Sequence, residues 1–545
     1  MHALLFSALL AVVSAPHAMV VTEQHLASQA GLAVLERGGN AVDAAVAVGY
    51  ALAVVDPCCG NLGGGGFMLI RMHDGRERFI DFREKAPLRA TRDMYLDAHG
   101  NVVPERSRKG WLAIGVPGTV MGLDRALAQF GTRSRAAVMA AAIRLARDGY
   151  VLQPGDMVPF RGSAGEGYSG WSAGGAKPHP GERVVQPDLA RTLELIAADG
   201  DEAFYRGPIA RAIVAAGNRH GGILSMRDFA DYTVDESAPI HCAYHDLEII
   251  SAPPPSSGGV TLCEILNVIA PYPFAQWGWH SVRETHYLIE AERRAYADRN
   301  AYLGDPTFVH DPVAQLLDPA YAAHLRAQID PVRATPSSRV HPGLKISVHE
   351  NGETTHYSIV DRWGNAVAVT YTLNDWFGSG VMAAGTGFLL NDEMDDFTSK
   401  PGVPNMYGLV QGETNDIQPG KRPLSSMTPT IVLRGGRLAM VTGSPGGSRI
   451  ITIVLETLLN VFDFGMNAQA AVDAPRVHMQ WLPDRIDYEP GALTAATMRA
   501  LRTEGYRFKE IPFWGSAQAI VADPRTGMLY GGTDRRHPAG AALGY

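Results

Sequence analysis

Two threonines and an asparagine fall close together in one short stretch, residues 351–374 (NGETTHYSIVDRWGNAVAVTYTLN). Its two β-rich halves, joined by turn-forming residues, predict an antiparallel hairpin folded about positions 363–364. In that hairpin Thr354 and Thr372 are close neighbours, and Asn374 lies one pleat further along the same side. A hydroxyl is a weak nucleophile unless a base and orienting groups lie beside it. The stretch therefore has the residue types for nucleophilic catalysis by a threonine.

Threonine can supply its own base when its α-amino group is free, because that amine titrates near neutral pH. Thr354 is internal in the sequence, so the chain would have to be cut between Glu353 and Thr354. Without such a cut the same residues form an ordinary hairpin with polar residues at the start of a strand. Taken by itself, the stretch favours this plainer interpretation.

The letters E-T-T-H-Y-S-I-V-D, from residue 353, and G-N-A-V-A-V-T-Y-T-L-N, from residue 364, resemble the self-processing site of the bacterial γ-glutamyltransferase (γ-glutamyl transpeptidase) family. Members of this family are N-terminal-nucleophile (Ntn) hydrolases, made as one precursor that cleaves itself just before the catalytic threonine. The resemblance implies that Thr354 is the nucleophile, that its released amine is the base, and that Thr372 orients the nucleophile.

Arg83 ends a predicted strand within residues 79–87 (FIDFREKAP). One interpretation is a surface ion pair with Asp81 or Glu84, which would contribute little. The other is a bidentate clamp on a substrate carboxylate, a geometry that guanidinium fits and ammonium does not. The stretch is similar to the family motif F-R-E-x-A-P, whose arginine binds the α-carboxylate of the γ-glutamyl group, and this resemblance favours the clamp.

Residues 391–397 (NDEMDDF) concentrate carboxylates, a pattern typical of a solvated loop or a cation site. The matching family segment holds the α-amino group of the substrate, which implies that role for Asp396, with Glu393 and Asn374 beside it. A carboxylate is the natural partner for an ammonium group taken out of water. Many bacterial relatives have glutamine at the position of Glu393, so the extra negative charge either tightens or disturbs amine binding.

Three further stretches resemble family motifs. Residues 421–427 (KRPLSSM) imply that Ser425 and Ser426 assist the arginine at the carboxylate. A predicted strand, the turn G-S-P-G-G-S and a helix point backbone N–H groups at one place, which generically predicts an anion site. The resemblance implies that Gly446 and Gly447 of this turn form the oxyanion hole. Tyr407 centres a proline- and glycine-containing segment that resembles the lid of bacterial relatives, and lids exclude water from acyl intermediates.

Other motifs are predicted to be structural. The glycine run of residues 60–66 lacks the G-K-[ST] ending and leads into a strand, which excludes a phosphate loop and favours close backbone packing. Residues 170–174 match G-x-S-x-G but lack the strand and helix that a nucleophile elbow needs. Residues 253–259 (PPPSSGG) are predicted as a rigid turn. Helices are predicted over residues 26–35, 41–55, 136–148, 188–198, 284–299 and 449–462.

The chain has 545 residues, 46% hydrophobic and 19% charged, which suits a globular protein with a large core. A net charge of −8 argues weakly against a nucleic-acid partner. Residues 1–15 resemble an apolar signal peptide too short to span a bilayer, although only His2 precedes the apolar run. The alternative is a buried N-terminal helix. We expect export to the periplasm or secretion, with no membrane span in the mature protein.

Four cysteines, Cys58, Cys59, Cys242 and Cys263, show no metal-ligand spacing. A bond between the adjacent Cys58 and Cys59 would be strained, so we expect buried thiols rather than disulfides.

Motifs from about residue 19 to residue 545 follow the order of the family, and this resemblance implies an α+β fold, the four-layer αββα sandwich of Ntn hydrolases. After a signal peptide (1–15), residues 16–353 would form a large subunit and residues 354–545 a small one, together a heterodimer. The implied substrates are glutathione or related γ-glutamyl compounds, with water, amino acids or peptides as acceptors. Neither a cofactor nor a metal is implied.

Two alternatives remain at this point. The chain could be a cephalosporin (glutaryl) acylase, with the same nucleophile and a donor without the α-amino group; Asp396 argues against this. It could also be a secreted binding protein that keeps an inactive scaffold, which the complete set of motif residues makes the weaker hypothesis.

Overall fold

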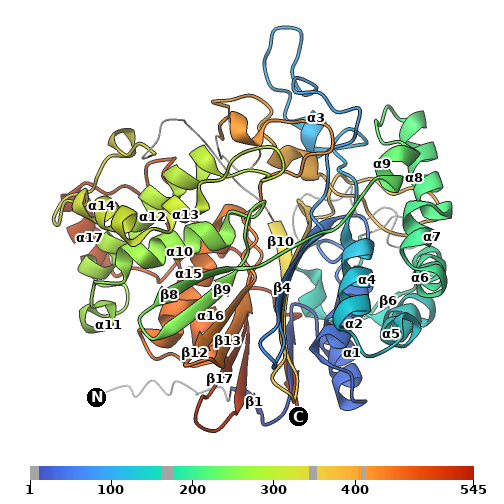
Figure 1. The fold of residues 1–545 in the computed structure, drawn as a ribbon, viewed down its shortest axis with the longest axis horizontal. Helices are drawn as coiled ribbons and strands as arrows, with labels where there is room; N and C mark the ends of the chain where they lie inside the picture. Colours follow the sequence, from blue (N-terminus) through green and yellow to red (C-terminus); the bar gives the residue numbers. More distant parts are fainter. Residues whose placement is uncertain (1–11, 161–176, 343–352, 404–405, 407–408, 410) are drawn as a thin grey trace.

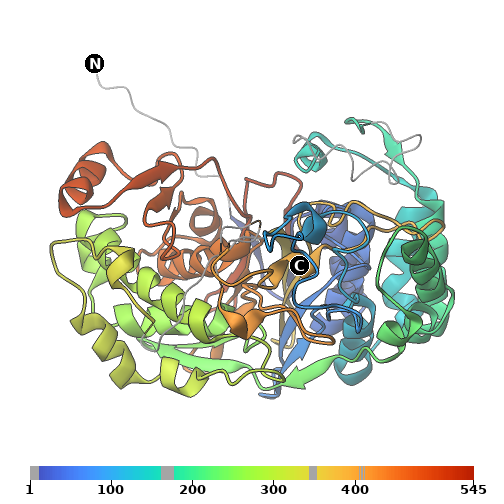
Figure 2. The same cartoon turned by 90° about the horizontal axis from the view of Figure 1, so that it is seen from above.

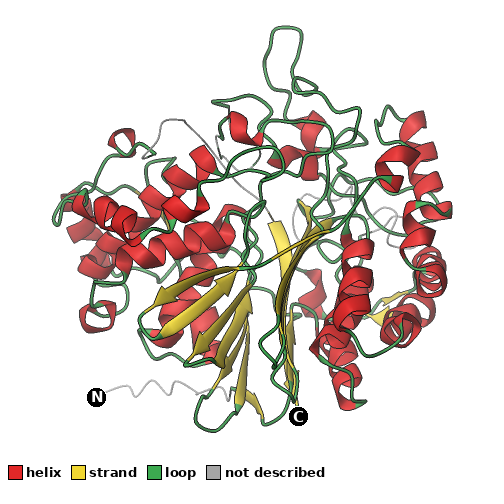
Figure 3. Ribbon diagram, viewed as in Figure 1, coloured by secondary structure: helices red, strands yellow, loops and turns green. Residues whose placement is uncertain are grey.

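A computed structural model describes residues 12–160, 177–342, 353–403, 406, 409 and 411–545. Strands lie at the centre of the molecule and helices lie outside them (Figures 1 and 3). In the described part of the chain, two seven-stranded antiparallel sheets form this centre. The fold is therefore a mixed α and β structure organised around two large sheets.

The sheets are built from strands that are far apart in the sequence. The first sheet, in spatial order, contains β1 (Val13–Ala15), β18 (Leu529–Thr533), β17 (Gln518–Ala522), β13 (Arg437–Gly443), β12 (Thr430–Arg434), β9 (Leu247–Ser251) and β8 (Ile240–Tyr244). The second contains β19 (Ala541–Gly544), β2 (Met19–Thr22), β10 (Glu353–Val360), β11 (Ala366–Asn374), β3 (Gly65–Arg71), β4 (Glu77–Asp81) and β7 (Asp235–Ser237). Each sheet contains strands from before residue 353 and strands from residue 353 onward.

The two sheets pack face to face through buried apolar side chains. Val21, Leu69 and Ala368 from the second sheet share one core with Val441 and Ile520 from the first. Strand β11 (AVAVTYTLN) is buried along its whole length, as expected for a strand that is covered on both faces.

Helices cover the outer face of each sheet. The first sheet is covered by α10 (Gly258–Ile269), α15 (Ile450–Phe462) and α16 (Ala468–Asp473), with α12 (Val282–Tyr302) packed on α10. The second is covered by α1 (His25–Glu36), α2 (Ala41–Val55) and α4 (Thr119–Phe130), with α5 (Arg135–Asp148) and α6 (Pro187–Asp199) outside them. The two helix groups lie on opposite sides of the sheets (Figure 2).

Shorter helices complete the periphery: α3 (Glu105–Arg108), α7 (Asp201–Tyr205), α8 (Pro208–Arg219), α9 (Met226–Ala230), α11 (Phe274–Trp277), α13 (Val313–Leu316), α14 (Pro319–Ala327) and α17 (Ala495–Glu504). Two small sheets lie outside the two large ones in the described part of the chain. One has two strands, β5 (Tyr150–Val151) and β6 (Arg183–Val184), and the other has three, β14 (Val477–His478), β15 (Ile486–Tyr488) and β16 (Phe508–Glu510).

Helix α2 illustrates how local sequence and burial agree. Asn40 accepts from the backbone N–H groups of Val42 and Asp43, while the Asp43 side chain accepts from Asn40, so the helix begins with a capping box. Every residue of α2 is buried, because the helix lies between the second sheet and α5. The prediction of a core helix at this position is confirmed.

The prediction of buried thiols is wrong. Disulfides join Cys242 to Cys263 and Cys58 to Cys59, so the described residues include no thiol. Cys242 lies on β8 and Cys263 on α10, and α10 packs against β8. This tertiary contact places their Cα atoms 5.9 Å apart, which a separation of 21 residues in sequence does not reveal.

Residues 12–15, the end of the predicted signal peptide, lie within the described part of the chain. Val13–Ala15 forms β1 and pairs with β18 at the edge of the first sheet. Among the described residues, no helix has both the length and the apolar composition to cross a membrane.

Candidate active site

The predicted hairpin is present, with an irregularity where the nucleophile is expected. Strands β10 and β11 pair from Val360 opposite Ala366 to Thr355 opposite Tyr371, and the register then shifts before Glu353 pairs with Asn374. Thr354 sits at this bulge and is 6% exposed. A bulge turns a side chain away from the regular alternation of a strand and is a common device beside active sites.

Thr354, Thr372 and Asn374 line one cavity. The cavity encloses about 350 Å³ of empty space, a volume that includes solvent at its open mouth. The Thr372 hydroxyl accepts a 2.8 Å hydrogen bond from the backbone N–H of Asn374. Asn374 has a φ of +81° and donates through Nδ2 to the carbonyl of Asp392 at 3.1 Å. Asparagine tolerates this left-handed conformation better than most residues, so the end of β11 turns toward the acidic segment.

The glycine run holds the backbone of Thr372 from behind. Asn61 donates through Nδ2 to the Thr372 carbonyl at 2.9 Å, and its Oδ1 accepts from the Gly64 N–H at 3.0 Å and from the Thr119 hydroxyl at 2.7 Å. A Cβ at Gly64 would lie 1.9 Å from the Thr372 carbonyl oxygen. Close backbone packing, as predicted for this run, is confirmed. The role of Asn61 was missed, because two of its partners, Thr119 and Thr372, are 58 and 311 residues away.

His356 lies two residues after Thr354 but is not a suitable base. Its ring contacts the hydroxyls of Thr370 at 2.8 Å and Ser358 at 3.1 Å, and it is fully buried. Burial lowers the pKa of His356 to about 3, so the ring stays neutral and binds protons weakly at neutral pH. The histidine is part of the sheet rather than of a catalytic pair.

Arg83 follows β4 and is buried, so the interpretation as a surface ion pair is wrong. Its guanidinium pairs with Glu393 through Nη1 and with Asp396 through Nη2, and Nε donates to the Pro423 carbonyl at 3.2 Å. Glu84 Oε2 lies 3.7 Å from Nη1. The sequence alone could not show that Arg83, the predicted carboxylate clamp, contacts Glu393 and Asp396, the predicted amine-binding acids.

Three carboxyl groups therefore surround one guanidinium. Burial raises the pKa of Glu84 to about 8 and that of Glu393 to about 8, although Arg83 opposes both shifts. Burial also raises the pKa of Asp396 well above its usual range. Desolvation exceeds the attraction of a single cation here, because each acid must share that cation with the other two.

Ser425 and Ser426 line the same cavity and are held by the P-P-P-S-S-G-G turn. The Ser425 carbonyl accepts from the N–H of Ser257 at 2.7 Å and from its hydroxyl at 2.6 Å. Arg299 on α12 donates to both the Ser257 hydroxyl and the Ser426 hydroxyl at 2.7 Å. The turn precedes α10 as predicted, but its support of the serine pair and the presence of Arg299 in the cavity wall were missed.

The G-S-P-G-G-S turn connects β13 to α15 as predicted. Gly446 and Gly447 have φ values of +134° and +59°, conformations that side chains rarely adopt. Their N–H groups have no hydrogen-bond partner within the described residues, and Gly447 lines the cavity while Gly446 lies behind it. A Cβ at Gly446 would lie 2.9 Å from the Ile453 side chain of α15. The turn is therefore closely packed on its far side.

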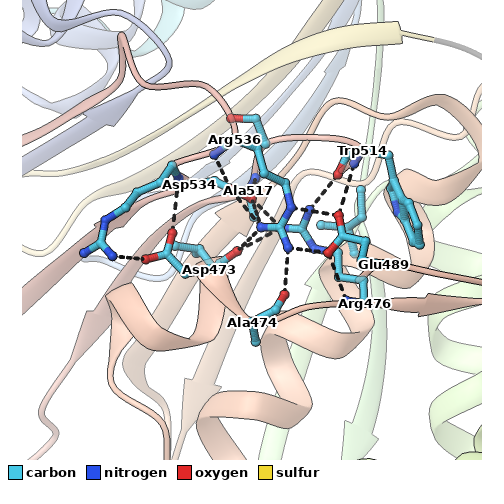
Figure 4. Close-up of polar contacts among 12 residues, drawn as sticks. Asp473, Ala474, Arg476, Glu489, Trp514, Ala517, Asp534 and Arg536 are labelled. Carbon is cyan, nitrogen blue, oxygen red and sulfur yellow. Dashed lines mark hydrogen bonds and ion pairs between the residues drawn. The ribbon is translucent and has the colours of Figure 1, made fainter. Parts of the chain in front are cut away.

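A buried ionic network supports the segment that packs behind this turn. Arg476 donates to the Trp514 carbonyl at 2.7 Å and pairs with Asp534, while Arg536 pairs with Glu489 and Asp534 (Figure 4). The Ser516 N–H, two residues after Trp514, donates to the Ser444 hydroxyl at 3.2 Å. Long-range ion pairs thus fix the wall that holds the glycine turn.

The remaining predicted positions lie partly outside the described residues. Tyr407, the centre of the predicted lid, and residues 170–174 are not among them, and of Glu353 only the backbone is described. Gln411 and Leu409 do line the cavity, together with Ser448. Within the described part of the chain, only Asp56, Cys58 and Cys59 lie close enough to share a metal ion, and both cysteines are disulfide-bonded.

Comparisons with known proteins agree on one family. A family model described as Gamma-glutamyltranspeptidase matches residues 27–544. The chain is 54% identical to the glutathione hydrolase proenzyme of Pseudomonas sp. (strain A14), over 98% of this chain and 95% of that protein. It is 46% identical to the glutathione hydrolase proenzyme of Escherichia coli (strain K12), over 98% and 93%. A crystal structure of a cephalosporin acylase from Bacillus halodurans superposes with a TM-score of 0.86 at 29% identity, covering 98% of this chain and 97% of that one.

Proposed function

The chain belongs to the gamma-glutamyltranspeptidase family, and on that premise we propose that it is an autoprocessing γ-glutamyltransferase and glutathione hydrolase. It transfers the γ-glutamyl group of glutathione or a related compound to water, an amino acid or a peptide. The observation that carries the proposal is the convergence of Thr354, Thr372, Arg83, Glu393 and Asp396 on one cavity.

The first stage is self-cleavage. The Thr354 hydroxyl attacks the Glu353 carbonyl, the peptide bond becomes an ester, and water hydrolyses this ester to release the Thr354 amine. The bulge supports this role, because it takes the Glu353–Thr354 bond out of the regular hydrogen-bonded ladder at the start of β10.

In the second stage the released amine is the general base. The Thr354 hydroxyl attacks the γ-carbonyl of the donor, and the acyl-enzyme then passes to the acceptor. Thr372 orients the nucleophile, and the N–H groups of Gly446 and Gly447 stabilise the oxyanion. The low pKa of His356 supports the amine as base, because the neighbouring imidazole is too weak a base for this step.

Donor recognition follows from the charges of the cavity. Arg83 with Ser425 and Ser426 holds the α-carboxylate, and Asp396 and Glu393 hold the α-ammonium, with Asn374 at the edge of the same cavity. Because Arg83 pairs with both acids in the structure, a donor must insert its carboxylate and ammonium groups between them. A zwitterionic donor replaces each lost ion pair with a new one.

We also infer the four-layer αββα sandwich of Ntn hydrolases, built by a large subunit (16–353) and a small subunit (354–545). Strands β10 and β11 of the small subunit lie between β2 and β3 of the large one, which supports a heterodimer with one shared core. Removal of residues 1–15 as a signal peptide, which takes β1 from the edge of the first sheet, and export to the periplasm complete the proposal. Tyr407 belongs to the proposed lid.

A second candidate is an acylase whose donor lacks the α-amino group, and the structural match to a cephalosporin acylase favours it. Buried Asp396 and Glu393 argue against it, because a glutaryl donor offers them no cation. Hydrolysis rates on γ-glutamyl and glutaryl anilides separate the two. We expect faster turnover of the γ-glutamyl compound and none with Thr354→Ala; preference for the glutaryl compound would support the acylase.

A further inference from the structure

The acid cluster around Arg83 carries more negative charge than its cation can balance. Arg83, Glu84 and Glu393 are each at most 1% exposed, and the Asp396 side chain is 15% exposed. With all three acids ionised, the group would hold a net charge of −2 away from water. Burying unpaired charge is costly, and carboxyl groups that share a site avoid this by retaining a proton.

Buried carboxyl oxygens that lack a donor point to two of the acids as the site of this proton. Both side-chain oxygens of Glu84 and Oε2 of Glu393 are buried without a hydrogen-bond donor among the described residues. The two side chains act on each other electrostatically, and each has a pKa raised to about 8 by burial. Glu393 and Asp396 both pair directly with Arg83, but Asp396 has no carboxyl oxygen that is buried without a hydrogen-bond partner. Two adjacent carboxyl groups that lack a donor are satisfied when one carries a proton and donates it to the other.

Close packing around Glu84 leaves its side chain little room to take another position. A Cβ at Gly65 would lie 2.8 Å from Glu84 Oε2, and one at Gly115 would lie 3.0 Å from Glu84 Cβ. The backbones of Gly65 and Gly115 thus pack closely against the Glu84 side chain. The other titratable or charged groups that face the cluster are Asp392 and Asp395 beside Glu393, Tyr232 beside Glu84, and Arg299 across the cavity.

We propose that Glu84 and Glu393 share one proton before a donor binds, and that the α-ammonium group of the donor displaces this proton to solvent. The inference rests on the proposed γ-glutamyl specificity. The donor ammonium enters between Glu393 and Asp396 and supplies N–H donors to Glu393, so it replaces the shared proton both as a donor and as a positive charge. Arg83 stays beside the acids, and Arg299, with Ser425 and Ser426, balances the donor carboxylate. Glu84 is thereby a positioning residue that adjusts the charge of the amine site without contacting the reacting atoms.

Calorimetric titration of the wild-type processed enzyme with L-glutamate at pH 7 tests the proposal. Titrations run in phosphate and in Tris give the proton count, because the two buffers differ in ionisation enthalpy. We expect release of close to one proton per glutamate bound, since a group with a pKa of about 8 is mostly protonated at pH 7. Glutarate, which has both carboxylates and no ammonium, should bind more weakly and release none.

Two variants locate the proton. Glu393→Gln and Glu84→Gln each remove one partner, so both should reduce proton release by at least half, and both should raise the donor KM more than they change kcat. Glu413→Gln is the matched control, because Glu413 is 72% exposed and pairs with Arg92 on the surface; it should keep the wild-type proton count. Self-cleavage of each variant, seen as two chains, reports that it has folded.

Several results would overturn the proposal. Glutamate binding without proton release, in an enzyme that hydrolyses γ-glutamyl anilide normally, would contradict it and leave the proposed function intact. Equal proton release with glutarate, or full release by Glu393→Gln, would also contradict it. If glutamate fails to bind and γ-glutamyl anilide is not hydrolysed, the proposed function itself fails, and this inference with it.

Discussion

Arg83 connects the two halves of donor recognition. Its guanidinium is buried against Glu393 and Asp396 and lies beside the backbone of the K-R-P-L-S-S-M segment. One side chain therefore holds the amine-binding acids in place and presents a cation to the donor carboxylate. Because guanidinium offers donors in a planar fork, it can serve partners in two directions, which an ammonium group cannot do equally well.

Arg83→Ala should weaken donor binding and destabilise the protein at the same time. Loss of a hydrogen-bonded charge pair with the donor predicts a KM increase of roughly 10- to 150-fold for a γ-glutamyl anilide. Removing one partner of a buried ion pair predicts a loss of about 3–5 kcal/mol in the free energy of unfolding. Self-cleavage should persist, because Arg83 has no part in it.

Steady-state kinetics and thermal denaturation measure both effects. Arg92→Ala is the control, because Arg92 is half exposed and pairs with Glu413 and Asp416 at the surface. An unchanged KM in Arg83→Ala would remove the clamp assignment.

The glycine turn between β13 and α15 acts through backbone N–H groups rather than through side chains. The positive φ values of Gly446 and Gly447 set the directions of the two N–H groups. Behind it lie the Ile453 side chain and Gly515, which the ionic network in Figure 4 supports. A side chain added at Gly446 would meet Ile453 Cδ1 at 2.9 Å and would hold a φ of +134°, which side chains rarely adopt.

Gly446→Ala should therefore lower kcat by about 10²–10³, the typical effect of losing one oxyanion donor. The donor KM should change little, because the cavity wall that binds the donor carboxylate is elsewhere. Gly436→Ala is a matched control, since Gly436 has a φ of +75° with open space around its Cβ and lies in the turn after β12. If both variants lose the same activity, general backbone strain and not the oxyanion hole is responsible.

Elements with strong local signals were predicted well, and contacts across the fold were not. The period of apolar residues and the capping residue Asn40 predict α2, and the β-rich halves predict β10 and β11. The bulge at Thr354 depends on what lies beside the hairpin, so the hairpin sequence alone does not reveal it.

In the candidate site, too, some residues were predicted from the sequence and others were not. Family motifs place Thr354, Arg83 and the serine pair in one cavity, as the structure does. They say nothing of Asn61 or Arg299, which reach Thr372 and Ser426 across the fold, and the motif that contains Glu84 gives that residue no role. Thiols were predicted in place of the disulfide between Cys242 and Cys263 for the same reason, because this disulfide depends on the packing of α10 against β8.

For the molecule as a whole, buried acids with raised pKa make stability depend on pH. Glu84 and Glu393 have a pKa of about 8 in the folded state, against about 4.5 in the unfolded chain. Between these values the folded state holds protons that the unfolded state has released, so stability falls as pH rises toward 8. His356 and His478, with pKa lowered to about 3, are neutral in the folded state, whereas an unfolded histidine is still half protonated near pH 6.5. Their effect is a smaller rise of stability with pH that is complete by about pH 8, and it is the same in the wild type and in Glu393→Gln.

We therefore expect the free energy of unfolding to fall between pH 6.5 and 8.5, by about 2 kcal/mol for one shared proton. Urea unfolding at the two pH values, with Glu393→Gln beside the wild type, measures the difference. The variant should show a smaller fall. Equal stability of the wild type at both pH values would contradict the charge assignment of the cluster.

The interleaving of the two chain segments makes cleavage at residue 353 compatible with a single folded body. Both sheets contain strands from both sides of the Glu353–Thr354 bond, and one apolar core joins them. Cutting one peptide bond at the start of β10 therefore changes the chemistry of Thr354 and leaves the packing of the sheets in place.

N-terminal sequencing and intact mass of the purified protein, beside Thr354→Ala, test the central claim most directly. We predict two chains in the wild type, one of them beginning at Thr354, and a single uncut chain in the variant. That result would identify the nucleophile and its base together. A wild-type chain that stays uncut after long incubation would contradict the mechanism, because Thr354 would have no released amine to act as base.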